Sequence, residues 1–215
     1  MTVDILIFAM VAAVILYRLY NMLGTHDDKN NVANNNNVIT LPKSDIQIDN
    51  DVETDQEEQY IISKLTEEKQ QALSQIKAKE KNFKINNFLK NSERAFELII
   101  EAFVAGDKKS LNKLASDEIA RNFIAEFDSL QKNNHKISIN IVAVVKNTIQ
   151  SINLNKDIAT ISIKFVTEQI SIVTDKNDKV ISGDKSKIEE IEDIWTFQKK
   201  LNTNSPVWVL CDTED

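Results

Sequence analysis

The order of apolar and polar residues divides the chain into parts with different periodicities. From Ile5 to Tyr17 the side chains are almost all apolar, whereas between residues 25 and 59 apolar residues are scattered without a period. A thin helical stripe follows, then regular helical spacing, and after His135 strict alternation. We therefore predict a membrane anchor over 1–24, an acidic disordered linker over 25–59, a charged helix over 60–82 and a folded domain over 83–215.

Helical spacing is clearest in the first half of this domain. Apolar residues three and four apart predict one buried helix face, formed by Ala95, Phe96, Ile99, Ile100, Phe103 and Val104. Gly106 is expected to end that helix, and Asp107 to cap a short helix after it. Ser116 is placed to cap a third helix, whose inner face is formed by Ile119, Phe123, Phe127 and Leu130.

The second half of the domain alternates as strands do. The strand candidates are Ile137–Val145, Ile149–Leu154, Ala159–Phe165, Ile170–Val173, the pair Val180 and Ile181, and a closing hairpin from Ile194–Phe197 to Trp208–Leu210 around Pro206. A turn is expected over 175–178. Helices followed by an antiparallel meander predict an α+β domain, in which the helices cover one face of a curved sheet.

The N-terminal apolar run is long enough to cross a bilayer. Val3 to Leu23 spans 21 residues, or roughly 31 Å of helix. Arg18 lies near the end of this span, where its long stem can reach the headgroups. The predicted anchor residues are Ile5, Leu6, Ile7, Phe8, Val11, Val14, Ile15, Leu16 and Arg18.

A cleaved signal peptide is the alternative interpretation of this run. It would need a basic start and a small-residue cleavage site, and the chain offers Asp4 and the sequence NMLGT instead. The basic residues that follow the span, Arg18 and Lys29, favour a cytoplasmic C-terminal domain. The single cysteine, Cys211, agrees with that compartment because it cannot form an internal disulfide.

Charge is distributed unevenly along the chain. The net charge is −7, which excludes a nucleic-acid polycation. The linker is acidic and is either a passive spacer or a segment that an anionic membrane repels. Lysines then gather before and inside the first long helix with phenylalanines between them, which predicts a surface for anionic lipid or a partner formed by Lys77, Lys79, Lys81, Phe83, Lys84 and Phe88. The alternative is a solvated helix face whose phenylalanines pack into the domain.

The sequence contains no strong catalytic, metal or cofactor motif. His26 and His135 are isolated, Cys211 has no nearby histidine, and there is no glycine-rich phosphate loop. Asp193, before Trp195, could act as a base in an apolar pocket, but a structural hydrogen bond is the simpler role. We therefore expect no enzyme, no cofactor and no metal.

Several ordered motifs resemble a known family. They are FLKNSERAFELIIEAFVAGD from Phe88, LNKLASDEI from Leu111, DIWTF from Asp193 and SPVWVLCDT from Ser205, with ILYRLYNMLGT near the N-terminus. Together they resemble bacterial TimA proteins, relatives of the C-terminal domain of the mitochondrial inner-membrane translocase subunit Tim forty-four. The resemblance covers the anchor and about residues 83–213. It departs at Asn91-Ser92, where the family has Gly-Ala, and at Val207, where it has Asn.

The resemblance implies a cone-shaped domain like nuclear transport factor two, with an apolar pocket. The pocket candidates are Phe96, Ile100, Phe103, Phe165, Trp195 and Trp208. It also implies a non-enzymatic adaptor at the bacterial inner membrane, whose protein partners belong to a translocase, an insertase or a chaperone system. A pocket that binds lipid or a small ligand is the alternative function, and the two tryptophans could equally be core residues that need no ligand.

Overall fold

The computed structural model describes residues 50–203 and 207–214, with side chains from residue 56 onward. The predicted anchor and residues 25–49 of the predicted linker lie outside this part of the chain. The described helices are α2 (Asn50–Ser63), α3 (Glu67–Lys79), α4 (Ile85–Ala105), α5 (Lys108–Leu114) and α6 (Asp117–Lys132). The strands are β1 (Lys136–Asn155), β2 (Ile158–Thr174), β3 (Val180–Gly183), β4 (Glu189–Lys200) and β5 (Val209–Glu214). Among the described helices, none is both long and apolar enough to cross a membrane.

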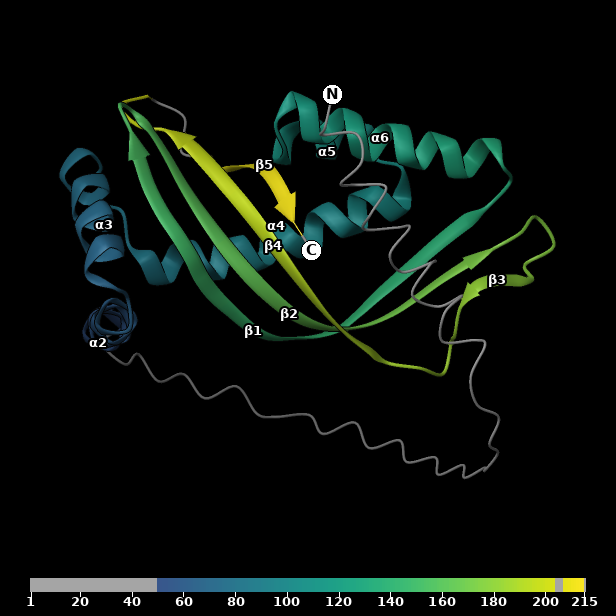
Figure 1. Cartoon of the computed structure of the whole chain (residues 1–215), viewed down its shortest axis with the longest axis horizontal. Helices are drawn as coiled ribbons and strands as arrows, with labels where there is room; N and C mark the ends of the chain where they lie inside the picture. The colour runs from purple at the N-terminus through teal and green to yellow at the C-terminus, as the bar shows by residue number, and fades with distance from the viewer. Residues whose placement is uncertain (1–49, 204–206, 215) are drawn as a thin grey trace.

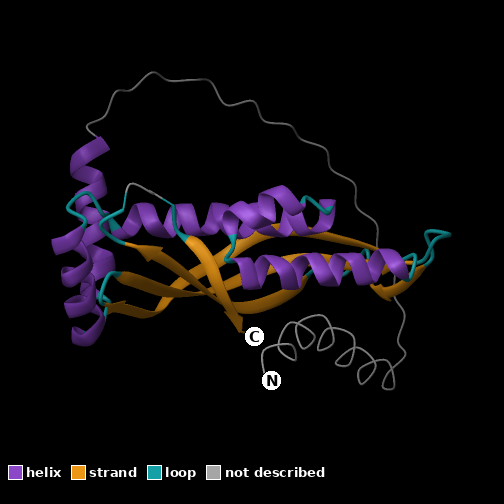
Figure 2. Ribbon diagram, turned by 90° about the horizontal axis from the view of Figure 1, so that it is seen from above, coloured by secondary structure: helices purple, strands orange, loops and turns teal. Residues whose placement is uncertain are grey.

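The strands form one antiparallel sheet in the order β1-β2-β4-β5, and β3 pairs with the end of β2 that β4 leaves free. Figure 1 shows that this sheet is strongly curved and that α4, α5 and α6 lie on its concave side. Figure 2, from above, shows α2 and α3 grouped at one end, across the direction of the strands. The prediction of an α+β domain with helices on a curved antiparallel sheet is confirmed.

The ends of the helices follow the predicted caps. Gly106 ends α4 with a positive φ of 67°, and a Cβ at that position would collide with the ring of Phe127. Asp107 accepts hydrogen bonds from the backbone N–H groups of Lys109 and Ser110, each at 3.1 Å, and Ser116 accepts one from Ile119 at 3.4 Å. These caps turn the chain sharply twice, which brings α5 and α6 back over the sheet.

The strands are longer than the pattern predicts. The two segments predicted as Ile137–Val145 and Ile149–Leu154 form one strand, β1, of 20 residues. Its pairing with β2 is interrupted by three register shifts. A bulge adds a residue to one strand and reverses the alternation beyond it. This explains why Val145 is 53% exposed, although it lies in phase with the inward residues before it.

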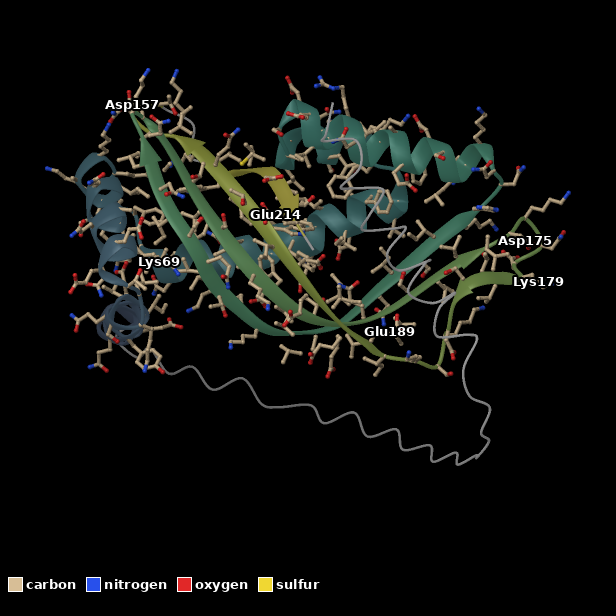
Figure 3. All side chains as sticks on the ribbon, viewed as in Figure 1. Lys69, Asp157, Asp175, Lys179, Glu189 and Glu214 are labelled. Carbon is tan, nitrogen blue, oxygen red and sulfur yellow. The ribbon has the colours of Figure 1, made fainter. Side chains whose placement is uncertain are left out.

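The two ends of β2 are marked by charged turns, at opposite ends of the molecule in Figure 3. Asp157 lies in the turn between β1 and β2, next to α3. At the other end, the Asp175 carboxylate accepts hydrogen bonds from the N–H groups of Asn177 and Lys179 at 2.8 and 3.0 Å, which lowers the pKa of that carboxyl. The turn predicted over 175–178 is confirmed.

The outer edge of β1 is partly covered by α3. The ammonium group of Lys69 donates a hydrogen bond at 3.1 Å to the carbonyl oxygen of Ile149. This bond satisfies an acceptor that a β-strand at the edge of a sheet would otherwise present to solvent.

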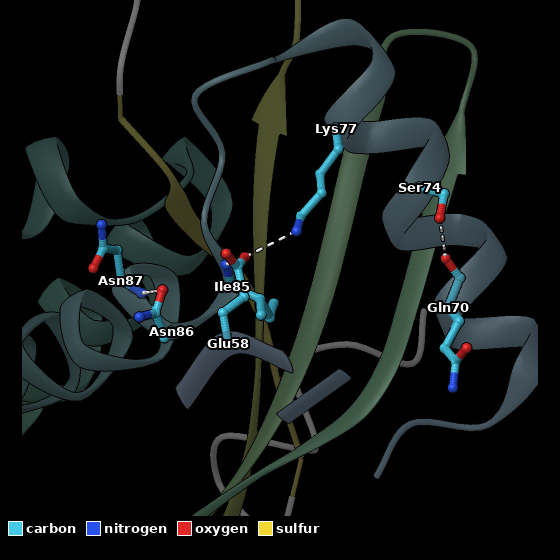
Figure 4. A network of polar contacts seen from close by, with 7 residues as sticks. All are labelled: Glu58, Gln70, Ser74, Lys77, Ile85, Asn86 and Asn87. Carbon is cyan, nitrogen blue, oxygen red and sulfur yellow. Dashed lines mark hydrogen bonds and ion pairs between the residues drawn. The ribbon is translucent and has the colours of Figure 1, made fainter. Parts of the chain in front are cut away.

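The N-terminal helices differ from the prediction at two places. The single helix expected around residues 60–82 is divided between α2 and α3, and α2 begins at Asn50, inside the predicted linker. Glu58 is only 8% exposed. Its carboxylate accepts a hydrogen bond from the Ile85 N–H at 2.9 Å and pairs with Lys77 at 2.9 Å (Figure 4). These bonds join α2 to the first turn of α4, where the helix dipole favours an anion. Because these contacts of α2 are polar, the start of this helix could not be predicted from the spacing of apolar residues.

Candidate functional site

A cleft of about 410 Å³ opens at the N-terminal end of α4, and we refer to it as the α4 cleft. Its walls come from four places: the connection between α3 and α4, the first half of α4, the end of β4, and the residues just before β5. These segments meet because Phe88, in the first turn of α4, contacts Phe197 of β4 and Trp208 just before β5.

The floor of the α4 cleft is aromatic. Trp208 packs edge-on against Phe88, with ring centroids 4.8 Å apart, and lies 5.7 Å from the ring of Phe83. Phe83 and Phe88 are 7% and 5% exposed, whereas Trp208 is half-buried and open to the cleft. The geometry is favourable for tilted aromatic pairs and leaves one indole available to a ligand.

The wall beside the floor contains a buried ion pair. Lys199 Nζ lies 2.7 Å from a carboxylate oxygen of Glu80, and the Lys199 side chain is only 8% exposed. Burying a lysine without a partner would be costly, so Glu80 fixes the lysine and the connection that follows α3.

The rim is rich in side-chain amides. Asn82, Asn87 and Asn91 line the cleft and are exposed. Ser92, buried beneath them, donates its hydroxyl to the carbonyl of Leu89 at 2.8 Å. Sequence reasoning did not select these asparagines, although two of them lie four residues apart on an otherwise amphipathic helix.

The predicted pocket candidates lie mostly in the core. Phe96, Phe165 and Trp195 are 0% exposed and contact one another, with the Phe96 ring 4.8 Å from Phe165 and 4.5 Å from Trp195. Ile100 and Phe103 are also buried. Of the six candidates, only Trp208 lines the α4 cleft. The others fill the space between α4 and the concave face of the sheet, because this is where the helix packs most closely.

The predicted basic surface is not a continuous one. Phe83 and Phe88 are buried, which favours the alternative of phenylalanines packed into the domain over an exposed lipid or partner surface. Lys77 pairs with Glu58 at 2.9 Å. Lys79 pairs with Asp157 at 2.6 Å, and that hydrogen bond lowers the pKa of the Asp157 carboxyl.

The two remaining lysines of that predicted surface are separated by their surroundings. Lys81 is exposed, and Lys84 is half-buried in the lining of the α4 cleft. With Lys77 and Lys79 already in ion pairs, an anionic membrane must compete with internal carboxylates for them.

Cys211 and Asp193, the two residues considered for chemistry in the sequence, both lie on strands of the sheet. In the described part of the chain, no group of three or more His, Cys, Asp or Glu side chains could hold a metal ion. Burial raises the pKa of the Cys211 thiol to about 11, and its S–H donates to the carbonyl of Thr196 at 3.3 Å. Asp193 is 3% exposed and pairs across the strands with Phe165; it does not line the α4 cleft.

A second groove of about 410 Å³ lies between α4 and α5. It is lined by Leu98, Ala102 and Ala105 of α4 and by Ser110 and Leu114 of α5. Three charged residues, Glu101, Asp107 and Lys113, complete its lining, and no aromatic ring is part of it. The α4 cleft is therefore the better candidate site.

The folded domain matches a known protein family. The model of the Tim44-like domain matches residues 69–215, which is more than half of the chain. This chain belongs to the Tim44-like domain family. The family match begins inside α3 and includes every strand, so both the α4 cleft and the curved sheet are parts of the Tim44-like domain.

A mitochondrial translocase subunit is similar to this chain over most of the same region. The mitochondrial import inner membrane translocase subunit TIM44-1 of Arabidopsis thaliana is 22% identical over 142 residues, which cover 63% of this chain and 30% of that protein. The chain thus spans less than a third of the length of this relative. A crystal structure of the intermembrane space region of the chloroplast protein ARC6 matches with a TM-score of 0.42 and 8% identity, over 59% of this chain and 94% of that one. This score is too low to relate the two proteins.

Proposed function

We propose that this protein is an adaptor that docks protein partners during protein translocation or the assembly of membrane proteins. The observation that carries the proposal is the Tim44-like domain over residues 69–215, together with a relative named as an import translocase subunit. The proposal concerns this chain's own domain, because the chain covers only 30% of that relative.

The architecture of the α4 cleft supports a docking role. It is an open cleft with an aromatic floor and an amide-rich rim. The one thiol of the chain is protonated at neutral pH, because burial raises the pKa of Cys211 to about 11. A thiol in that state is a poor nucleophile. We therefore propose a protein that binds and positions partners and does not act as an enzyme.

The N-terminal segment supports a membrane location for this role. The apolar run over residues 3–23 supports the proposal that the chain is a bacterial TimA protein, held by one span in the inner membrane with its domain in the cytoplasm. Contact with anionic lipid is a secondary part of this proposal, because two of the lysines available for it are held in ion pairs with Glu58 and Asp157.

In-cell crosslinking of the full-length chain tests the adaptor function. After crosslinking, the protein is purified under denaturing conditions and its partners are identified by mass spectrometry. A chain that lacks residues 1–24 is the control. We expect subunits of a translocase, an insertase or a chaperone to be enriched with the full chain. A profile equal to that of the control would count against the adaptor function.

The α4 cleft also favours a second candidate function, a module that binds a lipid tail or a small ligand. Its volume of about 410 Å³ lies within the range of small-molecule sites. Native mass spectrometry of the protein released gently from the membrane would then show a retained adduct. An adduct that disappears when Trp208 is replaced by Ala would place it in the cleft, whereas an adduct-free protein would leave the adaptor as the better interpretation.

A further inference from the structure

The first turn of α4 is not capped by the residue that precedes it. That residue is Lys84, and a lysine side chain has only donor hydrogens, so it cannot accept a hydrogen bond from the N–H groups that open a helix. The acceptor comes from α2 instead. A carboxylate oxygen of Glu58 accepts the Ile85 N–H at 2.9 Å (Figure 4). The cap of α4 is therefore supplied by a residue 27 positions earlier in the chain.

Two lysines beside this cap complete a binding site for carboxylates. Lys77 of α3 lies 2.9 Å from the same oxygen of Glu58, and Lys90 of α4 lies 2.9 Å from a carboxylate oxygen of Glu57. The hydrogen bond from Lys90 lowers the pKa of the Glu57 carboxyl. The Ile85 N–H and the two ammonium groups thus hold two successive carboxylates of one helix by charge-assisted bonds.

The donors of this site belong to the family domain, whereas the carboxylates do not. The Tim44-like match covers residues 69–215, which include Lys77, Ile85 and Lys90, and α2 ends before it at Ser63. None of the three donors lines the α4 cleft. The domain therefore has a second surface, which in this chain is covered by a segment from outside the matched domain.

The seated helix shows which chemistry this surface accepts. Ile61 and Ile62, four residues after Glu57 and Glu58, are partly buried and pack against the core. Residues four apart lie on the same face of a helix. The docked face of α2 therefore has the pattern Glu-Glu-x-x-Ile-Ile, and the two residues between the pairs are exposed. From Asn50 to Ser63 the helix has five acidic residues and no basic one.

The connection between α2 and the domain is short. Only residues 64–66 separate α2 from α3. A ligand on a short tether has an effective concentration on the order of mM, so it fills its site even when its own contacts are weak. The pair between Glu57 and Lys90 is exposed on both sides, at 45% and 66%, and such a pair contributes little. A similar helix on a partner that is itself held close to the chain can therefore compete with α2.

We propose that α2 is an internal ligand, which covers a docking surface for an acidic helix of a partner protein with the pattern Glu-Glu-x-x-apolar-apolar. The partner helix displaces α2, so the contact between α2 and α4 is autoinhibitory. This inference rests on the proposed adaptor function and names the kind of segment that the adaptor docks.

Fluorescence anisotropy with the full-length chain in nanodiscs of zwitterionic phosphatidylcholine tests the proposal. The probe is a fluorescein-labelled peptide with the sequence of residues 50–66 of this chain. The opened variant, Glu57→Gln/Glu58→Gln, removes both charges of the seated helix but keeps an amide oxygen that can cap α4. A second peptide carries the same two replacements.

We expect the probe to bind the opened variant about tenfold more tightly than the parent, whose own helix competes at high effective concentration. The second peptide should bind the opened variant about tenfold more weakly than the probe, because it lacks both charge-assisted bonds. Lys77→Ala/Lys90→Ala, added to the opened variant, should weaken binding of the probe by a similar factor. The matched control is Lys176→Ala/Lys185→Ala, which removes two exposed lysines on either side of β3 and should leave Kd unchanged.

Hydrogen exchange at the Ile85 amide is a second readout, which nonspecific binding of the peptide would not change. Exchange should be several times faster in the opened variant than in the parent. It should become slow again when the probe is bound, because a carboxylate of the probe then replaces that of Glu58. The melting temperature of each variant shows whether the domain remains folded.

Three outcomes would overturn the proposal: equal affinity of the probe for the parent and the opened variant, equal affinity of the two peptides, or no effect of Lys77→Ala/Lys90→Ala. Binding of the opened variant to anionic vesicles, without binding of the probe, would also overturn it and assign the two lysines to lipid headgroups.

The adaptor function is judged separately by crosslinking in cells. If the opened variant enriches the same partners as the parent in the same yield, the adaptor stands and this docking surface falls. If the probe binds as expected but neither protein enriches a partner, the docking surface stands and the adaptor function falls.

Discussion

The two tryptophans of this domain belong to two aromatic clusters with opposite properties. The inner cluster, formed by Phe96, Phe165 and Trp195, is 0% exposed and is closed between α4 and the sheet. The cleft cluster, formed by Phe83, Phe88 and Trp208, has the same kind of rings at similar distances but opens to solvent at its tryptophan. Phe197 joins the two, with its ring 6.4 Å from Trp195 and 6.2 Å from Phe88.

The difference comes from what covers each cluster. Trp195 lies in the middle of β4 under the centre of α4, whereas Trp208 stands before β5, where the helical layer begins. The same aromatic residue is thus enclosed where two layers meet and accessible to solvent where one layer ends. The inner cluster carries one cost of its closure, since Trp195 Nε1 has no hydrogen-bond partner among the described residues.

The largest expected effect is on the free energy of unfolding, to which the two clusters should contribute unequally. Trp195→Ala removes a ring that is 0% exposed, and we expect it to lower the free energy of unfolding by about 3–5 kcal/mol. Trp208→Ala removes a half-buried ring and should cost about 1–2 kcal/mol. Urea unfolding of both variants, followed by circular dichroism, measures the two values. Equal losses would mean that the cleft cluster is as much a part of the core as the inner one.

The next effect concerns the wall of the cleft. Glu80→Ala leaves Lys199, whose side chain is 8% exposed, without its partner, and we expect a loss of about 1–3 kcal/mol. The control is Glu192→Ala, which breaks the more exposed pair between Lys164 and Glu192 at 2.7 Å and should cost less than about 1 kcal/mol. Thermal melting of the two variants compares them directly. If the Glu80→Ala protein had the same melting temperature as the control, water would already reach Lys199 in the parent.

A smaller effect concerns how well the sheet shields the Cys211 thiol from solvent. Burial raises the pKa of Cys211 from 9.0 to about 11, so the thiol form is favoured by folding. Its contribution to stability is complete below pH 9 and is lost as the pH rises through 11. At pH 8 we therefore expect iodoacetamide to react at least tenfold more slowly with the folded chain than with the chain in urea. Equal rates would indicate an open sheet face.

The smallest structural change tests how accessible each of the two indole rings is to a quencher in solution. Trp208→Phe leaves only the closed tryptophan, and Trp195→Phe leaves only the open one while removing an unpaired N–H. Both replacements keep one ring in place, so each should cost less stability than the Ala variant at the same position. Acrylamide should quench the Trp195→Phe protein several times more strongly than the Trp208→Phe protein. Similar quenching would remove the distinction between the clusters.

Local signals in the sequence predicted much of the fold. Gly106, Asp107 and Ser116 have the chemistry that ends and begins helices, and each is found at its predicted cap. The change from helical spacing to alternation after His135 coincides with the start of β1 at Lys136. These features depend on neighbours within a few residues, which is why a single sequence reveals them.

What the sequence could not show depends on distant partners. Glu58 is buried only because Ile85 and Lys77, 27 and 19 residues away, supply its hydrogen bond and its ion pair. The bulges of β1 depend on its register with β2. Five of the six pocket candidates were aromatic or apolar residues that the packing of α4 buries completely or nearly so.

The candidate site was missed for a related reason. Asn87 and Asn91 gain meaning only when Trp208 is brought under the start of α4, more than a hundred residues further along the chain. In the sequence, Asn91 was visible only as a departure from the glycine of the resembling family. Exposed asparagines on a helix are common, and their pattern alone does not separate a binding surface from a solvated one.

The contact between Lys69 and the carbonyl of Ile149 affects how copies of this protein can pair through their sheet edges. An open strand edge would invite copies of the protein to stack into a continuous sheet. On β1, a lysine blocks one acceptor, α3 stands against the strand, and three bulges bend the rest of the edge away from a straight template. On the β1 side of the sheet, a neighbouring copy therefore finds no long, regular edge to which it could add a strand.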